Sequence, residues 1–302
     1  MGCRTAAQRP LTQDPGLYGP GSEAWLLNRE AALLLGAGPR ALLLQLAHPL
    51  VAAGVDEHSD FRADPWARLA GTLRSYLRIV YGTTPAARRE IRRLNRLHRG
   101  VTGPGYDARD PDLSLWVHAT LVDSTMATVD AWMEPLTRER RARFYAETLP
   151  VGRLFGIPDG VLPADVDRFD AYMAAMTGPA GPAHPTTTAR GLAAVILHPP
   201  LAPVVNRGPV AARLGPAAGP LGNALGRLPV NAATWLLLPS VGLLPEGVRR
   251  EYGFAWGTRE RVVAAWLVTA WRAWRPMVPP GLRWFPQAIA ADARTGVVGA
   301  GG

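Results

Sequence analysis

The sequence holds six histidines, and these are its side chains best suited to bind a metal or move a proton near neutral pH. They are His48, His58, His98, His118, His184 and His198. No two are spaced like a helical His-x-x-x-His zinc motif, and no Glu-x-x-His pair of a di-iron bundle occurs. The sequence also has no nucleophile elbow, P-loop or Gly-x-Gly-x-x-Gly fingerprint. Any chemistry would therefore come from a bound cofactor.

Two of the histidines, His98 and His118, fall on the apolar stripes of helices that the sequence predicts. On spacing alone, the favoured interpretation is that both are core histidines bonded to nearby backbone. The alternative is that one imidazole points into an apolar pocket and ligates a haem iron. Arg68 and Thr72 are four positions apart and would share a face of the preceding helix. Spacing alone favours a surface arginine there, with a threonine bonded back to its own helix.

The candidate residues lie on predicted helices whose starts are marked by proline. Asp64-Pro65, Thr84-Pro85 and Asp110-Pro111 each place a capping residue before a proline suited to the first helical position. They predict helices over 66–80, 86–99 and 112–132, and further helical patterns cover 22–36, 40–48, 140–149, 163–176, 192–197, 236–238, 245–252 and 258–274. No period-two alternation exceeds about four residues, so the predicted fold class is all-α.

The chain of 302 residues is long enough for one large helical domain. We expect an irregular lead-in over 1–21, a single domain over 22–290 and a flexible tail over 291–302. Within the domain, residues 178–229 are rich in proline and glycine. We expect this segment to be dominated by loops that pack on the helical body, and a linker between two domains is the alternative.

Composition excludes several classes of protein. The sequence is 48% hydrophobic and 19% charged, which is typical of globular chains. Its net charge of +9 comes from arginines that are mostly scattered, which favours solvated helix faces over nucleic-acid binding. The single Cys3 excludes a disulfide, an iron–sulfur cluster or a thiolate zinc site within one chain. Since no apolar run is long enough to span a bilayer, we expect a cytoplasmic protein without stable membrane insertion.

Short motifs along most of the chain resemble, in the same order, the catalytic domain of the rubber oxygenase/mpaB oxygenase family. The resemblance covers about residues 22–290. The motifs are Gln45–Val55, His58–Phe61, Asp64–Thr72, Tyr81-Gly82, His98 with Gly103, Tyr106–Ala108, Asp110–Leu121, Leu244-Pro245, Arg249 with Tyr252-Gly253, and Leu282–Pro286. Each motif alone is short, and their common order is what makes the resemblance specific.

This resemblance implies an all-α fold that encloses one haem b, with globin-like helical packing and a histidine as the axial iron ligand. Matched residue by residue, His98 corresponds to that ligand. Arg68 and Thr72 match an Arg-x-x-x-Thr element that lies near the haem in latex-clearing relatives. His118 is the second choice for the iron, and otherwise would line or brace the pocket. His48 and His58 match family positions to which no role is given.

The function that the resemblance implies is a haem-dependent oxygenase that uses dioxygen and a hydrophobic small molecule, with oxidative cleavage of a carbon–carbon double bond as the reaction. Arg68 would stabilise negative charge on oxygen and Thr72 would orient it. Gly71 stands where latex-clearing members carry a lysine, so a lysine-closed resting state is impossible, which weighs against activity on rubber. The alternatives are a carrier or sensor that binds haem or an apolar ligand, and a helical structural protein that has lost the cofactor.

Overall fold

Helices form nearly all of the regular structure in the computed structural model, which describes residues 14–198 and 230–296. The predicted all-α class is therefore confirmed. The first half of the chain contains α1 (Glu23–Asn28), η1 (Ala31–Leu34), α2 (Ala37–Ala47), α3 (Pro49–His58), α4 (Pro65–Tyr81), α5 (Thr84–His98), α6 (Pro111–Trp132) and α7 (Arg138–Leu154). The second half contains α8 (Val166–Thr177), α9 (Thr187–Leu197), α13 (Val230–Gly242), α14 (Glu246–Glu251), α15 (Thr258–Trp274), η3 (Arg275–Met277), α16 (Pro280–Arg283) and α17 (Pro286–Thr295).

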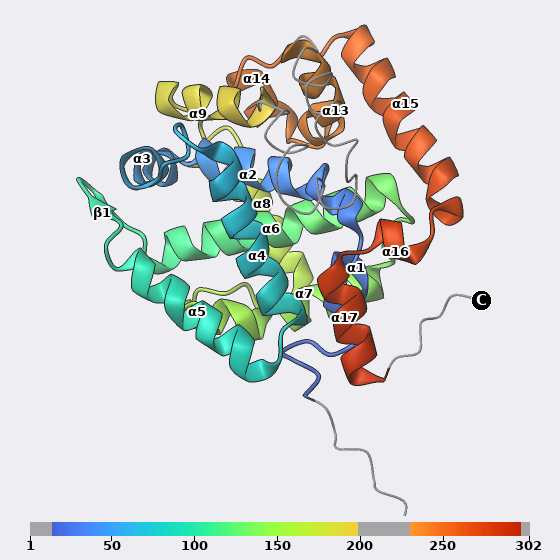
Figure 1. The fold of residues 1–302 in the computed structure, drawn as a ribbon. Coiled ribbons are helices and arrows are strands. Elements are labelled where there is room, and N and C mark those ends of the chain that lie inside the picture. Colours follow the sequence, from blue (N-terminus) through green and yellow to red (C-terminus); the bar gives the residue numbers. More distant parts are fainter. Residues whose placement is uncertain (1–13, 199–229, 297–302) are drawn as a thin grey trace, which may run out of the picture.

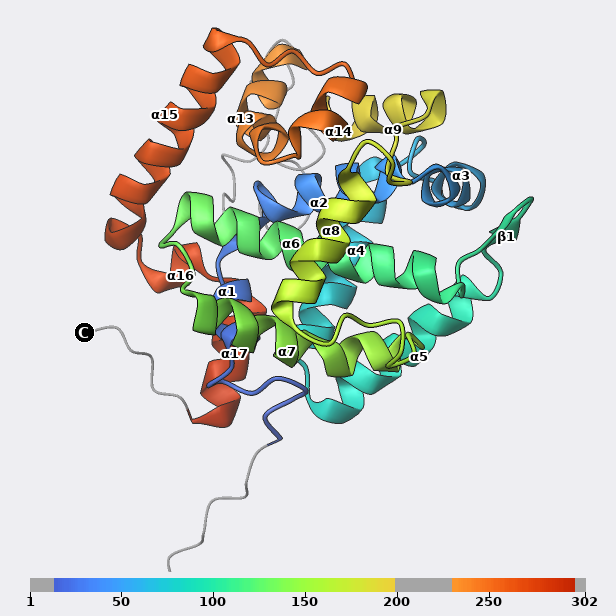
Figure 2. The ribbon, with the colours of Figure 1, turned by 180° about the vertical axis from the view of Figure 1, so that it is seen from behind.

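The α6 helix runs through the middle of the molecule, with α2 packed along it (Figure 1). Seen from behind, α7 and α8 lie against its other side (Figure 2). Trp116, Ala119 and Met126 of α6 are fully buried, as are Leu43 and Leu44 of α2. Because α6 is apolar on most of its surface, it is stable only when other helices surround it, and this requirement organises the fold.

Local capping explains where the helices around α6 begin. The side chains of Asp64 and Asp110 accept hydrogen bonds from the first-turn amides of α4 and α6, as the sequence predicted. The cap of α5 is Thr83 rather than Thr84, so this helix starts one residue earlier than its proline signal indicated. All three helices start within two residues of their predicted positions.

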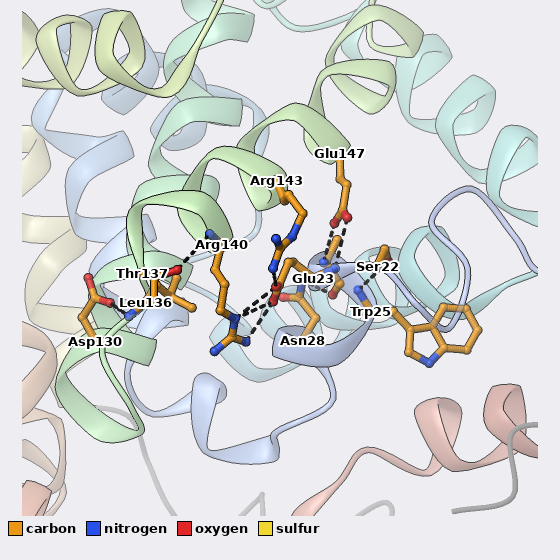
Figure 3. Close-up of polar contacts among 11 residues, drawn as sticks. Ser22, Glu23, Trp25, Asn28, Asp130, Leu136, Thr137, Arg140, Arg143 and Glu147 are labelled. Carbon is orange, nitrogen blue, oxygen red and sulfur yellow. Dashed lines mark hydrogen bonds and ion pairs between the residues drawn. The ribbon is translucent and has the colours of Figure 1, made fainter. Parts of the chain in front are cut away.

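A buried ion cluster fixes α1 against α7 (Figure 3). Glu23 is buried and accepts hydrogen bonds from Arg140 and Arg143 of α7, at distances between 2.8 and 3.2 Å. These two guanidinium groups lower the pKa of Glu23. The Glu147 carboxylate accepts from the amides of Glu23 and Ala24 at 3.2 and 2.8 Å. Since each of these groups has its partners, we assign the cluster a structural role.

Several segments differ from the sequence predictions. The helix expected over 22–36 is interrupted after Asn28, where Glu30 forms a backbone bridge with Trp284. The α2 helix already begins at Ala37, because Pro39 is tolerated in a first turn. The sequence pattern does not indicate α3, α17 or the hairpin of β1 (Thr102–Gly103) and β2 (Tyr106–Asp107), in which Thr102 pairs with Asp107.

The expected loop-dominated segment 178–229 contains α9, and its part from 199 to 229 lies outside the described residues. The α17 helix continues to Thr295, inside the segment expected to be a flexible tail. Residues 1–13 of the lead-in and 297–302 of the tail also lie outside the described part.

Within the described ranges, no single helix is long and apolar enough to cross a membrane. The stretches Ala31–Ala47 and Pro49–His58 together have the required length and composition, but they are bent by 105° at the break between them. Buried core helices of ordinary domains have the same composition, and α2 is such a helix.

Candidate functional site

Arg68 and Thr72 lie on the exposed side of α4 and contact each other. The Arg68 Nη1 atom donates to Thr72 Oγ1 at 2.6 Å, and its Nε atom donates to Ser59 Oγ at 3.2 Å. The Thr72 hydroxyl in turn donates to the Arg68 carbonyl at 3.1 Å. The threonine is thus bonded back to its own helix, as spacing alone favoured, and the same bonds fix the guanidinium. Ser59, at the end of α3, was not predicted as part of this group.

His98 is the last residue of α5 and is half-buried. Burial lowers the pKa of its imidazole, and the positive charge of Arg68 lowers this pKa further. Arg68 and His98 lie on α4 and α5, which pack against each other. Among the described residues, no hydrogen bond to the His98 ring is found. At neutral pH the ring is therefore neutral, with nitrogen atoms available to a metal or a substrate.

His118 lies on α6, and its Nε2 atom is buried without a hydrogen-bond partner in the described structure. Burial lowers the pKa of His118 to about 4. The ring faces Gly152 of α7, where an added Cβ atom would lie 3.5 Å from Nε2. Spacing alone favoured a core histidine bonded to nearby backbone, and the described structure shows no such bond to Nε2. The apolar Leu162 lies beside the same glycine.

His48 and His58 occupy different surroundings. His48 is buried at the junction of α2 and α3, and its Nδ1 atom has no partner within the described ranges. Burial lowers the pKa of His48, while the nearby Asp110 carboxylate raises it. His58 lies with its Nε2 atom 3.0 Å from the Thr102 carbonyl and its ring edge-on to Tyr106 at 6.2 Å. These contacts indicate that His58 braces the hairpin against α3.

The structure therefore joins Arg68 and Thr72 with Ser59 by hydrogen bonds and places His98 on the adjacent α5. His48 and His118 have other neighbours, and His58 directly precedes Ser59 in the chain. In the described part of the chain, no three His, Cys, Asp or Glu side chains are grouped to hold a metal ion. A multi-ligand metal centre is thus not formed there. A haem iron needs only one protein ligand, since the porphyrin supplies the others.

The donor set at this group fits a haem. His98 offers a neutral imidazole that no described residue engages, and Arg68 offers a cation for which no carboxylate partner is found in the described structure. A cation together with a neutral ring suits a bound group that carries negative charge. His118 offers a second neutral imidazole with an unpartnered nitrogen, so it competes with His98 for the role of iron ligand.

Two surface hollows lie elsewhere. One of about 620 Å³, on the outer side of α4 and α5, is lined by Arg78, Arg89, Arg92, Arg93 and Arg96 around Glu90. Glu90 is bonded to Arg93, Arg78 and Ser75, which lower its pKa to about 2. The other hollow, of about 260 Å³, is mostly apolar and lies between α13 and α15. His98 lines neither of them.

Comparison with protein families gives a match over most of the chain. The family model described as ER-bound oxygenase mpaB/B′/Rubber oxygenase, catalytic domain matches residues 25–273. This range includes Arg68, Thr72 and all six histidines. No curated protein and no solved structure matches the chain significantly.

Proposed function

Because the chain belongs to the mpaB/rubber oxygenase catalytic-domain family, we propose that it is a haem b-dependent oxygenase acting on a hydrophobic small molecule. Family membership supports oxygenase activity in general, with dioxygen as one substrate. The haem, the apolar substrate and the oxidative cleavage of a carbon–carbon double bond are the further parts of the proposal, and the reaction rests on family analogy.

The observation that carries the proposal is that Arg68 on α4 and His98 on α5 lie on two helices that pack against each other. The two residues come from different helices and are 30 positions apart (68 and 98), yet the charge of Arg68 lowers the pKa of the His98 ring. His98 would hold the iron through a ring nitrogen. The haem, when bound, supplies the redox chemistry that activates dioxygen.

Arg68 and Thr72 would act on oxygen that carries negative charge. The guanidinium now donates to Ser59 and Thr72, and it would exchange one of these neutral acceptors for a stronger, charge-assisted hydrogen bond. Thr72 is held by its bond to the Arg68 carbonyl, so its hydroxyl keeps one orientation. Leu69 and Leu73, half-buried next to these residues on α4, would supply apolar contacts for the substrate.

Absorption spectroscopy after haem-supplemented expression tests the ligand. We expect a Soret band in the wild-type protein, a shift of that band when the reduced protein binds carbon monoxide, and loss of the band in His98→Ala. His118→Ala tests the competing ligand and should keep its haem. The exposed His198→Ala is the matched control.

Loss of haem in His118→Ala but not in His98→Ala would identify His118, rather than His98, as the iron ligand. A wild-type protein without a Soret band after haem reconstitution would refute the haem proposal altogether. Full haem loading without oxygen consumption across a panel of alkenes would instead support a carrier or sensor.

A further inference from the structure

The α15 helix lies on the outer edge of the molecule and packs against it with one face only (Figure 1). Ala264 is buried on that face, and Val268 and Trp271 pack on the main core. A helix in this position normally turns charged and polar side chains to solvent. The outer face of α15 departs from that rule.

Large apolar side chains cover this outer face. Val262 and Trp266 are one turn apart, and Trp274 follows two turns later on the same side. Met277 in η3 and Leu282 in α16 are two further exposed apolar side chains beyond the end of the helix. These five side chains, which we call the exposed stripe, are between 61 and 67% exposed. Exposed apolar side chains that occur singly are common on protein surfaces, but a group of this size indicates an interaction surface.

Contacts behind the exposed stripe hold it in place. Arg272 donates from Nε and Nη2 to the Met133 carbonyl at 3.0 and 2.8 Å. Arg275 and Arg283 both pair with Glu30, at 2.9 and 3.2 Å, and the Glu30 side chain is only 3% exposed. The stripe is therefore preformed on a fixed segment, which lowers the entropic cost of binding.

The charges around the exposed stripe indicate what charge its binding partner should carry. Residues 258–285 contain five arginines, of which Arg275 and Arg283 pair with Glu30. The only acidic residue of this segment is Glu260, whose carboxylate accepts from the Gly257 amide at 2.8 Å. Arg259 and Arg261 are exposed in the first turn of α15, and Arg259 stacks over the Trp235 ring at 4.5 Å. A symmetric contact between two copies would place these arginines against an equally basic surface. An anionic partner is favoured instead.

We propose that the exposed stripe docks on the surface of a lipid bilayer that contains anionic headgroups. Trp266 and Trp274 would lie at headgroup level, where tryptophan side chains are favoured, with Val262, Met277 and Leu282 in contact with the acyl boundary. Arg259 and Arg261 would bind the anionic headgroups. This is peripheral docking rather than insertion, and it does not depend on the proposed haem.

Vesicle flotation of the full chain tests this proposal, with quenching of tryptophan fluorescence by brominated acyl chains as a second readout. We expect binding to vesicles of phosphatidylcholine with phosphatidylglycerol, and weaker binding to phosphatidylcholine alone or at high salt. The double variant Trp266→Ser/Trp274→Ser should bind about tenfold more weakly or worse. Arg259→Gln/Arg261→Gln should lower only the binding that depends on phosphatidylglycerol.

Leu97→Ser is the matched control, because Leu97 is 56% exposed on α5, outside the stripe, and its replacement should leave flotation unchanged. Circular dichroism checks that each variant is folded. Absence of flotation with both kinds of vesicle would overturn the proposal, as would equal flotation of the tryptophan variant. A wild-type dimer that binds no vesicles and dissociates on the tryptophan substitutions would assign the stripe to a second copy of the chain.

Discussion

The His118 imidazole should make the folded state sensitive to acid. Its pKa is lowered to about 4 by burial, whereas in the unfolded chain it would be near the ordinary value of about 6.5. Between these values the unfolded state binds a proton that the folded state does not. The free energy of unfolding should therefore fall as the pH drops from about 6.5 to about 4, by roughly 1 to 3 kcal/mol for this partly exposed ring.

Chemical denaturation of the haem-free protein at several pH values measures this effect. His118→Gln should be less sensitive to acid across the same window, because glutamine does not titrate. His198→Gln, a change at an exposed histidine, should behave like the wild type. An unchanged acid sensitivity in His118→Gln would mean that other groups are responsible for it.

At the residue scale, spacing predicted only what a single helix determines. The contact between Arg68 and Thr72 follows from their four-residue separation, and the structure confirms it. The influence of Arg68 on the pKa of His98 depends on how α4 packs against α5, which no local pattern encodes. For the same reason the sequence did not reveal Ser59 as a partner of Arg68, or Gly152 as the neighbour of His118.

At the scale of elements, the predicted helix starts were accurate because caps and prolines act within one turn. The missed elements depend on distant contacts. The hairpin is held to α3 by a hydrogen bond of 2.6 Å from Tyr106 to Glu57, and by the packing of Tyr106 against His58. The α17 helix is stabilised by its packing against α4. Local propensity alone does not predict such elements.

The close packing of the start of α2 against α6 should require a glycine at position 36. A Cβ atom added to Gly36 would lie only 2.3 Å from Cγ2 of the fully buried Thr128. Gly36→Ala should therefore lower the free energy of unfolding by about 1 to 3 kcal/mol, measured by chemical denaturation. Removing the Thr128 side chain should relieve the clash, so Gly36→Ala should cost much less in a Thr128→Ala background.

Thr128→Ala alone should be tolerated, because the buried Thr128 hydroxyl has no hydrogen-bond partner within the described ranges. The double-mutant cycle then isolates the clash itself. An equal cost of Gly36→Ala in both backgrounds would show that the destabilisation arises elsewhere, for instance in the backbone of the turn before α2.

At the scale of the whole molecule, the two ends of the described chain are packed together. The matched family segment ends at residue 273, yet Ala288 and Ala291 of α17, with its N-cap residue Phe285, belong to a core cluster that also contains Trp25 and Tyr81. The Phe285 amide donates to the Arg29 carbonyl at 2.9 Å, and Glu30 pairs with Arg275 and Arg283. The folded unit therefore extends beyond the matched segment.

Asp292 tests whether α17 belongs to the cooperative fold. Its Oδ1 atom accepts a hydrogen bond of 2.7 Å from the indole nitrogen of Trp25, and both residues are buried. Asp292→Ala leaves this indole N–H without an acceptor, so the free energy of unfolding should fall by about 1 to 3 kcal/mol. Asp292→Asn keeps an oxygen in the same place and should cost less. In denaturation experiments, a shift of the whole unfolding transition in Asp292→Ala would show that residues 286–295 and the N-terminal helices unfold as one unit. If α17 instead unfolds independently of the rest of the protein, Asp292→Ala would leave the main unfolding transition unchanged.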